Sequence, residues 1–174
     1  VTIQVDSLGP PNQTNSCDNP FKVHAVERMH DAYAAKSYLE NQSYVDDKRI
    51  AVMGWSHGAW TVLYTVDKNH MDDNVPGPFK AAIALYPYCE FSLIHLNAPL
   101  LILIGGEDDW SPAHLCKNME LGPESSDEIT LKVYSKAYHG FDFEGTDTEV
   151  KGHKIKFDPA ATKNAISQVK RFFE

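Results

Sequence analysis

Strand-sized apolar runs recur along the chain and are separated by segments with helical spacing. Three of these runs, at residues 49–55, 81–86 and 99–104, are rich in aliphatic residues and nearly continuous, whereas residues 129–134 alternate apolar and polar positions. Continuous apolar strands are typical of a parallel sheet that is buried on both faces. We therefore expect a mostly parallel sheet at the centre of the fold.

Helices are predicted between these strands. Ala32, Ala35 and Leu39 recur at helical spacing in a segment without Gly or Pro. Strands that alternate with helices in this way predict an α/β fold, and the chain length of 174 residues suits a single domain. The predicted helices span residues 23–40, residues 59–67, residues 112–121, and the stretch from Asp158-Pro159 to Phe172.

The start of the chain is predicted to be part of the sheet. Residues 1–7 alternate apolar and polar side chains like a strand, and residues 9–20 are rich in Pro, Asn and Ser like a loop. An unpaired strand edge invites association with another chain. We therefore expect residues 1–174 to be the C-terminal portion of an N-terminally truncated fold, or a homo-oligomer to cover this edge strand.

The sharpest local signal is Gly54-Trp55-Ser56-His57-Gly58, which stands between a predicted strand and a predicted helix. This is the context of a nucleophile elbow, in which a tight turn lifts the serine hydroxyl above the sheet and points the following N–H at the substrate oxyanion. Ser56 is therefore the predicted nucleophile, and the backbone N–H of His57 is the predicted oxyanion donor. A glycine-rich turn with an incidental serine is the alternative interpretation.

A serine nucleophile needs a histidine base and a carboxylate that orients the base. Among eight histidines, His139 directly follows the last predicted strand, which suits the chain order serine, acid, histidine. His153 is the alternative base. The acid is expected after the strand rich in Leu and Ile, where Glu107, Asp108 and Asp109 are consecutive. We predict Asp108 as the acid, with Asp109 as the alternative.

The elbow, the stretch Gly-Gly-Glu-Asp-Asp-Trp-Ser-Pro at residues 105–112 and the stretch Tyr-His-Gly-Phe at residues 138–141 resemble, in this order, the dienelactone hydrolase family of α/β-hydrolases. The resemblance covers nearly all of the chain. In that family the acid and a proline commonly stand as G-x-x-D-x-x-x-P and the base stands in His-Gly-Phe, which implies Asp108 and His139. The family implies hydrolysis of a lactone or a carboxylic ester through an acyl-enzyme, without a cofactor.

Two departures from the family bear on the substrate and on the extent of the fold. Its best-known members carry a cysteine nucleophile, and this chain has Ser56, which is closer to a general esterase. The family also begins with further strands and an oxyanion loop containing His-Gly, and none precedes Val1.

Two other functions are alternatives to an esterase. Gly54-Trp55-Ser56 also resembles the prolyl oligopeptidase family, so a serine peptidase is the alternative enzyme. A hydrolase-like domain that binds a ligand or partner without catalysis is an alternative of another class, because the missing oxyanion loop would weaken catalysis.

Composition and charge limit the classes of molecule that the protein is expected to bind. The chain has 24 Asp and Glu against 16 Lys and Arg, for a net charge of −8, which disfavours nucleic acid and anionic membranes. No apolar stretch approaches the length of a membrane span. No CxxC pair, HExxH motif or Cys/His cluster has zinc spacing, so no metal site is expected. A small-molecule ester or lactone is the expected partner.

The pairing of the cysteines indicates the cellular compartment in which the protein is expected. Cys89 follows one predicted strand, and Cys116 lies in the helix after the next strand. If those strands are neighbours, both sulfurs lie near the same edge of the sheet. We predict a Cys89–Cys116 disulfide, which would place the protein in the periplasm or outside the cell; two buried free thiols, the alternative, would suit the cytoplasm.

Overall fold

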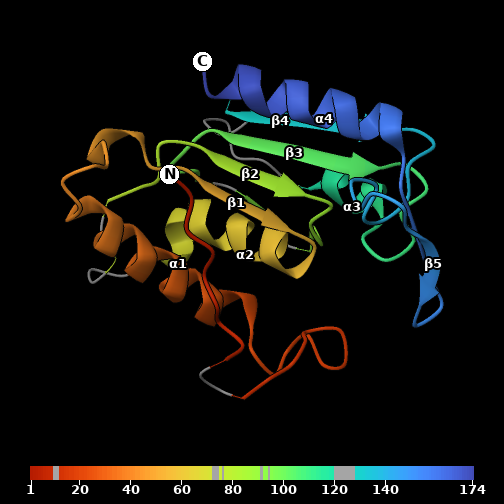
Figure 1. Cartoon of the computed structure of the whole chain (residues 1–174), viewed down its shortest axis with the longest axis horizontal. Helices are drawn as coiled ribbons and strands as arrows, with labels where there is room; N and C mark the ends of the chain where they lie inside the picture. The colour runs from red at the N-terminus through yellow and green to blue at the C-terminus, as the bar shows by residue number, and fades with distance from the viewer. Residues whose placement is uncertain (10–11, 72–74, 76, 91, 94, 120–127) are drawn as a thin grey trace.

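A four-stranded parallel sheet forms the centre of the fold. The computed structural model describes residues 1–9, 12–71, 75, 77–90, 92–93, 95–119 and 128–174. The strand order is β1-β2-β3-β4, and every neighbouring pair is parallel, so the carboxyl ends of all four strands lie at the same edge (Figure 1). The strands are β1 (Val52–Trp55), β2 (Ala82–Leu85), β3 (Leu100–Gly105) and β4 (Ile129–Tyr134).

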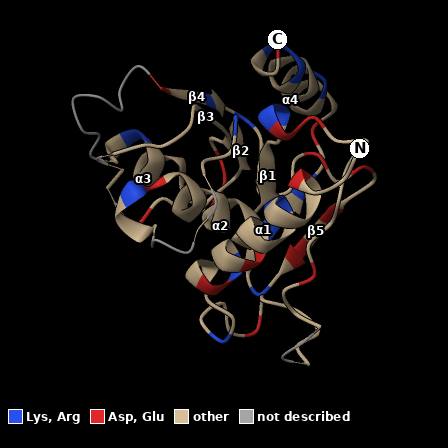
Figure 2. Cartoon of the chain, turned by 90° about the vertical axis from the view of Figure 1, so that its left-hand side faces the viewer, with Lys and Arg blue, Asp and Glu red and all other residues tan. Residues whose placement is uncertain are grey.

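Helices cover both faces of this sheet, which confirms the predicted α/β architecture. The two views place α4 on one face and α2 and α3 on the other, and α1 packs against α2 (Figure 1, Figure 2). No helix in the described ranges is both long and apolar enough to cross a membrane. The helices are α1 (Ala25–Glu40), α2 (His57–Val66), α3 (Ala113–Asn118) and α4 (Pro159–Phe172).

The boundaries of the helices differ little from the prediction. Asp158 caps α4 as expected, because its carboxylate accepts the N–H groups of Ala160 and Ala161. The helix predicted at residues 112–121 ends already at Asn118, and its predicted last residue, Leu121, lies outside the described residues.

The core is aliphatic and centred on β2 and β3, in which every residue is buried. Their sequences, AIAL and LLILIG, have no polar side chain, so both faces of the sheet can be covered by helices. Ala161 and Ala165 of α4 pack against one face, where their small side chains allow close approach. Burial of each Leu or Ile side chain contributes roughly 1.5–3 kcal/mol, so this region dominates the stability of the fold.

The strand predicted at residues 1–7 is not present, which corrects the expectation. Residues 1–6 form no strand and pair with no strand of the described residues. Val1 and Ile3 are 94% and 46% exposed. The physical reason is that alternation only makes a segment compatible with a sheet, whereas a strand also needs a neighbour that takes its backbone hydrogen bonds. The sheet therefore begins with β1, which is one of its two edge strands.

An antiparallel hairpin lies between β4 and α4, where the sequence pattern predicts neither a helix nor a strand. Its strands are β5 (Asp147–Val150) and β6 (His153–Lys156). Lys151 and Gly152 both have positive φ, 53° and 86°, as a two-residue hairpin turn requires. Acidic residues mark β5 in Figure 2, and Asp147 pairs there with Lys154 of β6. Each of its strands has four residues and a single apolar one, Val150 or Ile155, which is too few for an alternating pattern to be recognised.

Candidate active site

Ser56 lies in a sharp turn between β1 and α2. Its backbone has φ 51° and ψ −118°, a sparsely populated conformation that costs about 1–3 kcal/mol for a residue with a side chain. The Ser56 N–H donates to the carbonyl of Leu85 at 3.0 Å, which ties the turn to β2. A Cβ at Gly54 would lie 2.2 Å from the carbonyl oxygen of Gly58, so the turn requires glycine there. These are the features of a nucleophile elbow.

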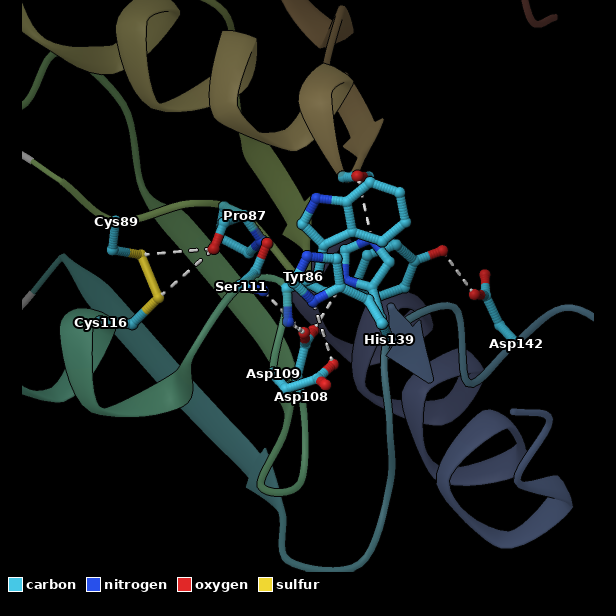
Figure 3. A network of polar contacts seen from close by, with 12 residues as sticks. Tyr86, Pro87, Cys89, Asp108, Asp109, Ser111, Cys116, His139 and Asp142 are labelled. Carbon is cyan, nitrogen blue, oxygen red and sulfur yellow. Dashed lines mark hydrogen bonds and ion pairs between the residues drawn. A yellow bond between two sulfur atoms is a disulfide. The ribbon is translucent and has the colours of Figure 1, made fainter. Parts of the chain in front are cut away.

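His139 connects Ser56 to Asp108 by two hydrogen bonds. Its Nε2 lies 2.9 Å from Ser56 Oγ, and its Nδ1 lies 2.8 Å from Asp108 Oδ2. In Figure 3 the His139 ring and the Asp108 carboxylate face each other. A carboxylate can only accept, so the proton sits on Nδ1 and Nε2 is left to accept the serine hydroxyl. The structure therefore brings together the three residues singled out in the sequence.

Asp108 is itself held in place. It is 4% exposed, and its Oδ1 accepts the backbone N–H groups of Trp110 at 3.0 Å and Ser111 at 2.7 Å. These bonds satisfy the oxygen that does not face His139. The carboxylate is thereby fixed in the orientation that points Oδ2 at the imidazole.

The two alternative residues lie beside the three-residue array but outside it. His153 Nδ1 lies 3.5 Å from Asp109 Oδ1, and neither has a hydrogen bond to Ser56. The Trp110 ring lies between the two histidines, 4.9 Å from the His153 ring centroid and 5.3 Å from that of His139. Geometry therefore favours His139 over His153 and Asp108 over Asp109.

His57 begins α2, so its backbone N–H lies in the first helical turn, where it has no partner within the helix. Its side chain fastens the elbow to other parts of the chain. The Nδ1 atom lies 2.7 Å from Arg28 Nη1, and Nε2 lies 2.8 Å from the carbonyl oxygen of Pro20. Because arginine can only donate, Nδ1 accepts and Nε2–H donates, as in a neutral ring. Burial lowers the pKa of His57, and the Arg28 charge lowers it further.

Tyr86 and Asp142 are site neighbours whose roles the sequence does not reveal. Tyr86 directly follows β2, is fully buried, and has φ 43°. Its ring lies edge-on to the His139 ring with centroids 4.6 Å apart, and its hydroxyl donates to Asp142 at 2.7 Å. A positive φ in a non-glycine residue cannot be read from a tyrosine in an apolar run, and Asp142 lies in a segment without a periodic pattern.

A disulfide joins Cys89 and Cys116. It connects the segment after β2 to α3, which follows the loop of Asp108, and both sulfurs lie near the carbonyl oxygen of Pro87 (Figure 3). The predicted pairing is therefore present, and Cys17 is an exposed free thiol.

A parallel sheet with a serine elbow after β1, an acid after β3 and a histidine after β4 defines an α/β-hydrolase. The chain belongs to the dienelactone hydrolase family, whose sequence model matches residues 4–174. Membership of this family supports a hydrolase.

Solved structures with similar folds include two proteins of this kind. A putative dienelactone hydrolase from Klebsiella pneumoniae superposes with a TM-score of 0.68 at 20% identity, over 94% of this chain and 69% of that one. The apo form of Thermogutta terrifontis esterase 2 has a TM-score of 0.64 at 18% identity, over 89% of this chain and 67% of that one. At these identities the likeness concerns the fold.

Peptidases are also among the similar proteins. Porphyromonas gingivalis dipeptidyl peptidase 4 has a TM-score of 0.59 at 18% identity, over 86% of this chain but only 22% of that one. A probable dipeptidyl-aminopeptidase B from Fusarium vanettenii is 39% identical over 44 residues, which are 25% of this chain and 5% of that protein. The chain thus spans a small part of these peptidases.

Proposed function

We propose that the chain is a serine hydrolase that cleaves a carboxylic ester or lactone through an acyl-enzyme. The observation that carries the proposal is the pair of His139 hydrogen bonds, 2.9 Å to Ser56 Oγ and 2.8 Å to Asp108 Oδ2. Ser56 is the nucleophile, His139 the general base and acid, and Asp108 the group that orients the imidazole. The strained elbow supports this assignment, because strain is retained where function depends on it.

The proposed reaction has two similar halves. Ser56 Oγ forms a bond to the carbonyl carbon while its proton passes to His139 Nε2, and the carbonyl oxygen becomes an oxyanion. The N–H of His57 donates to that oxyanion at the positive end of α2. When the carbon–oxygen bond of the ester breaks, the leaving alcohol takes the proton from Nε2. Water then repeats the sequence, the acid product leaves, and Ser56 regains its proton.

Asp108 stabilises the imidazolium that forms in each half. Its two oxygens accept hydrogen bonds from His139, Trp110 and Ser111, which hold the carboxylate against the imidazole. The closed lactone ring of a cyclic ester would be opened by the same steps, and its alcohol would then remain attached to the acyl group until water releases it.

Turnover of short-chain aryl esters tests this function. Purified chain should hydrolyse p-nitrophenyl acetate and a simple aryl lactone, and the Ser56→Ala variant should not. An aminoacyl-proline p-nitroanilide is the comparison substrate for the peptidase alternative. Rapid cleavage of that anilide without ester hydrolysis would favour the peptidase, and turnover of neither class would favour a binding domain.

We propose an oxidising compartment as the location, because a disulfide such as Cys89–Cys116 persists there and is rare in the cytosol. The homo-oligomer expected at residues 1–7 has no strand edge there, so we propose a second copy of the chain along the outer edge of β1 instead, where Met53 and Trp55 are 37% and 43% exposed. Sedimentation at two protein concentrations tests the second point. A monomer at high concentration, with full esterase activity, would overturn it.

A further inference from the structure

The carboxylate of Asp142 joins three parts of the chain that meet at the site. Its Oδ2 accepts Trp55 Nε1–H at 2.8 Å, and its Oδ1 accepts the Tyr86 hydroxyl at 2.7 Å. Trp55 ends β1 and immediately precedes Ser56, whereas Tyr86 follows β2. Asp142 itself lies in the segment of His139, and Figure 3 shows its bond to Tyr86 beside the imidazole. One side chain thus links the histidine segment to the ends of two strands.

Apart from the bonds of the imidazole to Asp108 and Ser56, the other hydrogen bonds of the histidine segment lead away from β1 and β2. The His139 carbonyl accepts the N–H of Lys156 at 3.3 Å, and the Phe141 carbonyl accepts the N–H of Asp158 at 2.8 Å. These bonds lead to β6 and to the start of α4. In the described part of the chain, hydrogen bonds from residues 139–142 to β1, β2 and the turns after them come from Asp142 and from the contact of His139 with Ser56.

Tyr86 transmits this anchoring to the imidazole. Its ring meets that of His139 edge-on, at 4.6 Å between centroids and 60° between planes, so the tyrosine limits rotation of the imidazole. Burial raises the pKa of Tyr86 far above its ordinary value, and the nearby charges of Asp142 and Asp108 raise it further. At neutral pH the Tyr86 hydroxyl therefore keeps its proton and donates a hydrogen bond to Asp142.

We propose that Asp142 is a positioning residue that keeps His139 Nε2 aligned with Ser56 Oγ by holding Trp55 and Tyr86. This inference rests on the proposed function of Ser56 and His139. Asp142 acts through these neighbours, and a misplacement of about 1 Å at such an array can cost about 100-fold in rate. Loss of the carboxylate should therefore slow the chemical step and leave substrate binding nearly unchanged.

Kinetics of Asp142→Ala on p-nitrophenyl acetate test the proposal. We expect kcat to fall about 10- to 100-fold while KM stays within about threefold. Asp142→Asn keeps the size and one acceptor, so it should retain more activity than the alanine variant. Glu144→Ala is the matched control, because Glu144 is an exposed carboxylate in the same segment, and its kcat should equal that of the wild type.

A double mutant separates positioning from a general loss of structure. Tyr86→Phe removes one donor and should lower kcat by itself. Added to Asp142→Ala, it should lower kcat little further, because the acceptor of that bond is already gone. Additive losses would overturn the proposal, as would Asp142→Ala and Asp142→Asn variants whose kcat equals that of Glu144→Ala.

Nitrogen NMR of the His139 ring gives a readout that does not need turnover. In wild type the ring should show one Nδ1-protonated tautomer, and in Asp142→Ala its Nε2 signal should shift or broaden as alignment is lost. The same His139 signals in both proteins would overturn the proposal. If wild type hydrolyses no ester and Ser56→Ala behaves alike, the proposed function fails, and the NMR comparison still decides the role of Asp142.

Discussion

The strands β2 and β3 and the segment that carries His139 are held by different forces. The strands consist of buried aliphatic and small residues and are paired along their whole length in a regular parallel register. The histidine segment instead is fixed by hydrogen bonds to single atoms, as at Asp142 and the His139 carbonyl, and by the charged hairpin β5–β6. Apolar burial is non-directional, whereas hydrogen bonds fix distances and angles.

This difference assigns separate tasks to the two regions. The sheet provides stability and brings the ends of its strands to one edge, and the polar segment, on the proposal above, sets the alignment of the imidazole. Changes in the sheet should therefore lower the free energy of unfolding, while changes in the site should lower turnover of a chain that remains folded. The predictions below are ordered from the largest expected effect to the smallest.

Removal of either partner of the central hydrogen bond should have the largest effect. Ser56→Ala and His139→Ala are each expected to lower kcat on an aryl ester by about 10⁴-fold or more. The double variant should be little worse, because the residues act as a unit. Steady-state assays on folded protein measure kcat for each variant, and thermal unfolding serves as the control for correct folding. Independent, multiplying losses would contradict a shared mechanism.

Truncation in the centre of β3 should mainly affect stability. Ile102 is fully buried, and Ile102→Ala is expected to cost about 2–5 kcal/mol in urea unfolding. Ile166 on α4 is 52% exposed, so Ile166→Ala is the matched control and should change stability by at most about 0.5 kcal/mol. Equal losses in both variants would mean that burial does not separate the two positions.

The disulfide should contribute to stability rather than to chemistry. It closes a loop with a sequence separation of 27, for which the chain-entropy relation predicts about 3.5 kcal/mol. Unfolding of wild type and of a Cys89→Ala/Cys116→Ala variant measures this contribution. Alkylation of unfolded protein without reductant should modify Cys17 alone. Two or three modified thiols per chain would show that the bridge is not formed.

The smallest predicted effect is a pH dependence of stability from His57. Burial lowers its folded pKa below the ordinary value of 6.5, so between these two values the unfolded chain binds a proton that the folded chain does not. Stability should therefore fall as the pH drops below about 6.5, and level off below the folded pKa. In His57→Gln this part of the slope should vanish. An identical slope in urea titrations of both proteins would count against a buried neutral imidazole.

The sequence predicts the sheet and the three central residues because their signals are local. A run such as LLILIG has no polar side chain, so its composition alone predicts a buried strand. Ser56 stands between a predicted strand and a predicted helix, and the flanking glycines indicate a tight turn. Parallel strands then place the residues after β1, β3 and β4 at one edge. Asp108 and His139 could thus be assigned from their order along the chain.

The remaining features depend on contacts that are distant in sequence. Asp142 bonds to Trp55 and Tyr86, which are 87 and 56 residues away, and nothing near Asp142 indicates either partner. The strands of the hairpin β5–β6 have four residues each with one apolar residue per strand, so the sequence pattern is too short to identify them. Residues 1–7 show the opposite case, an alternating pattern without a neighbouring strand to pair with.

The central claim is that Ser56 is a nucleophile activated by His139. Its most direct test is to label the folded chain with a fluorophosphonate and to map the modified residue by peptide mass spectrometry. One phosphonyl group per chain should appear on Ser56 in wild type, and labelling should be lost in Ser56→Ala and be strongly slowed in His139→Ala. A label on another residue, or none on folded wild type under conditions that label a known serine esterase, would contradict the account.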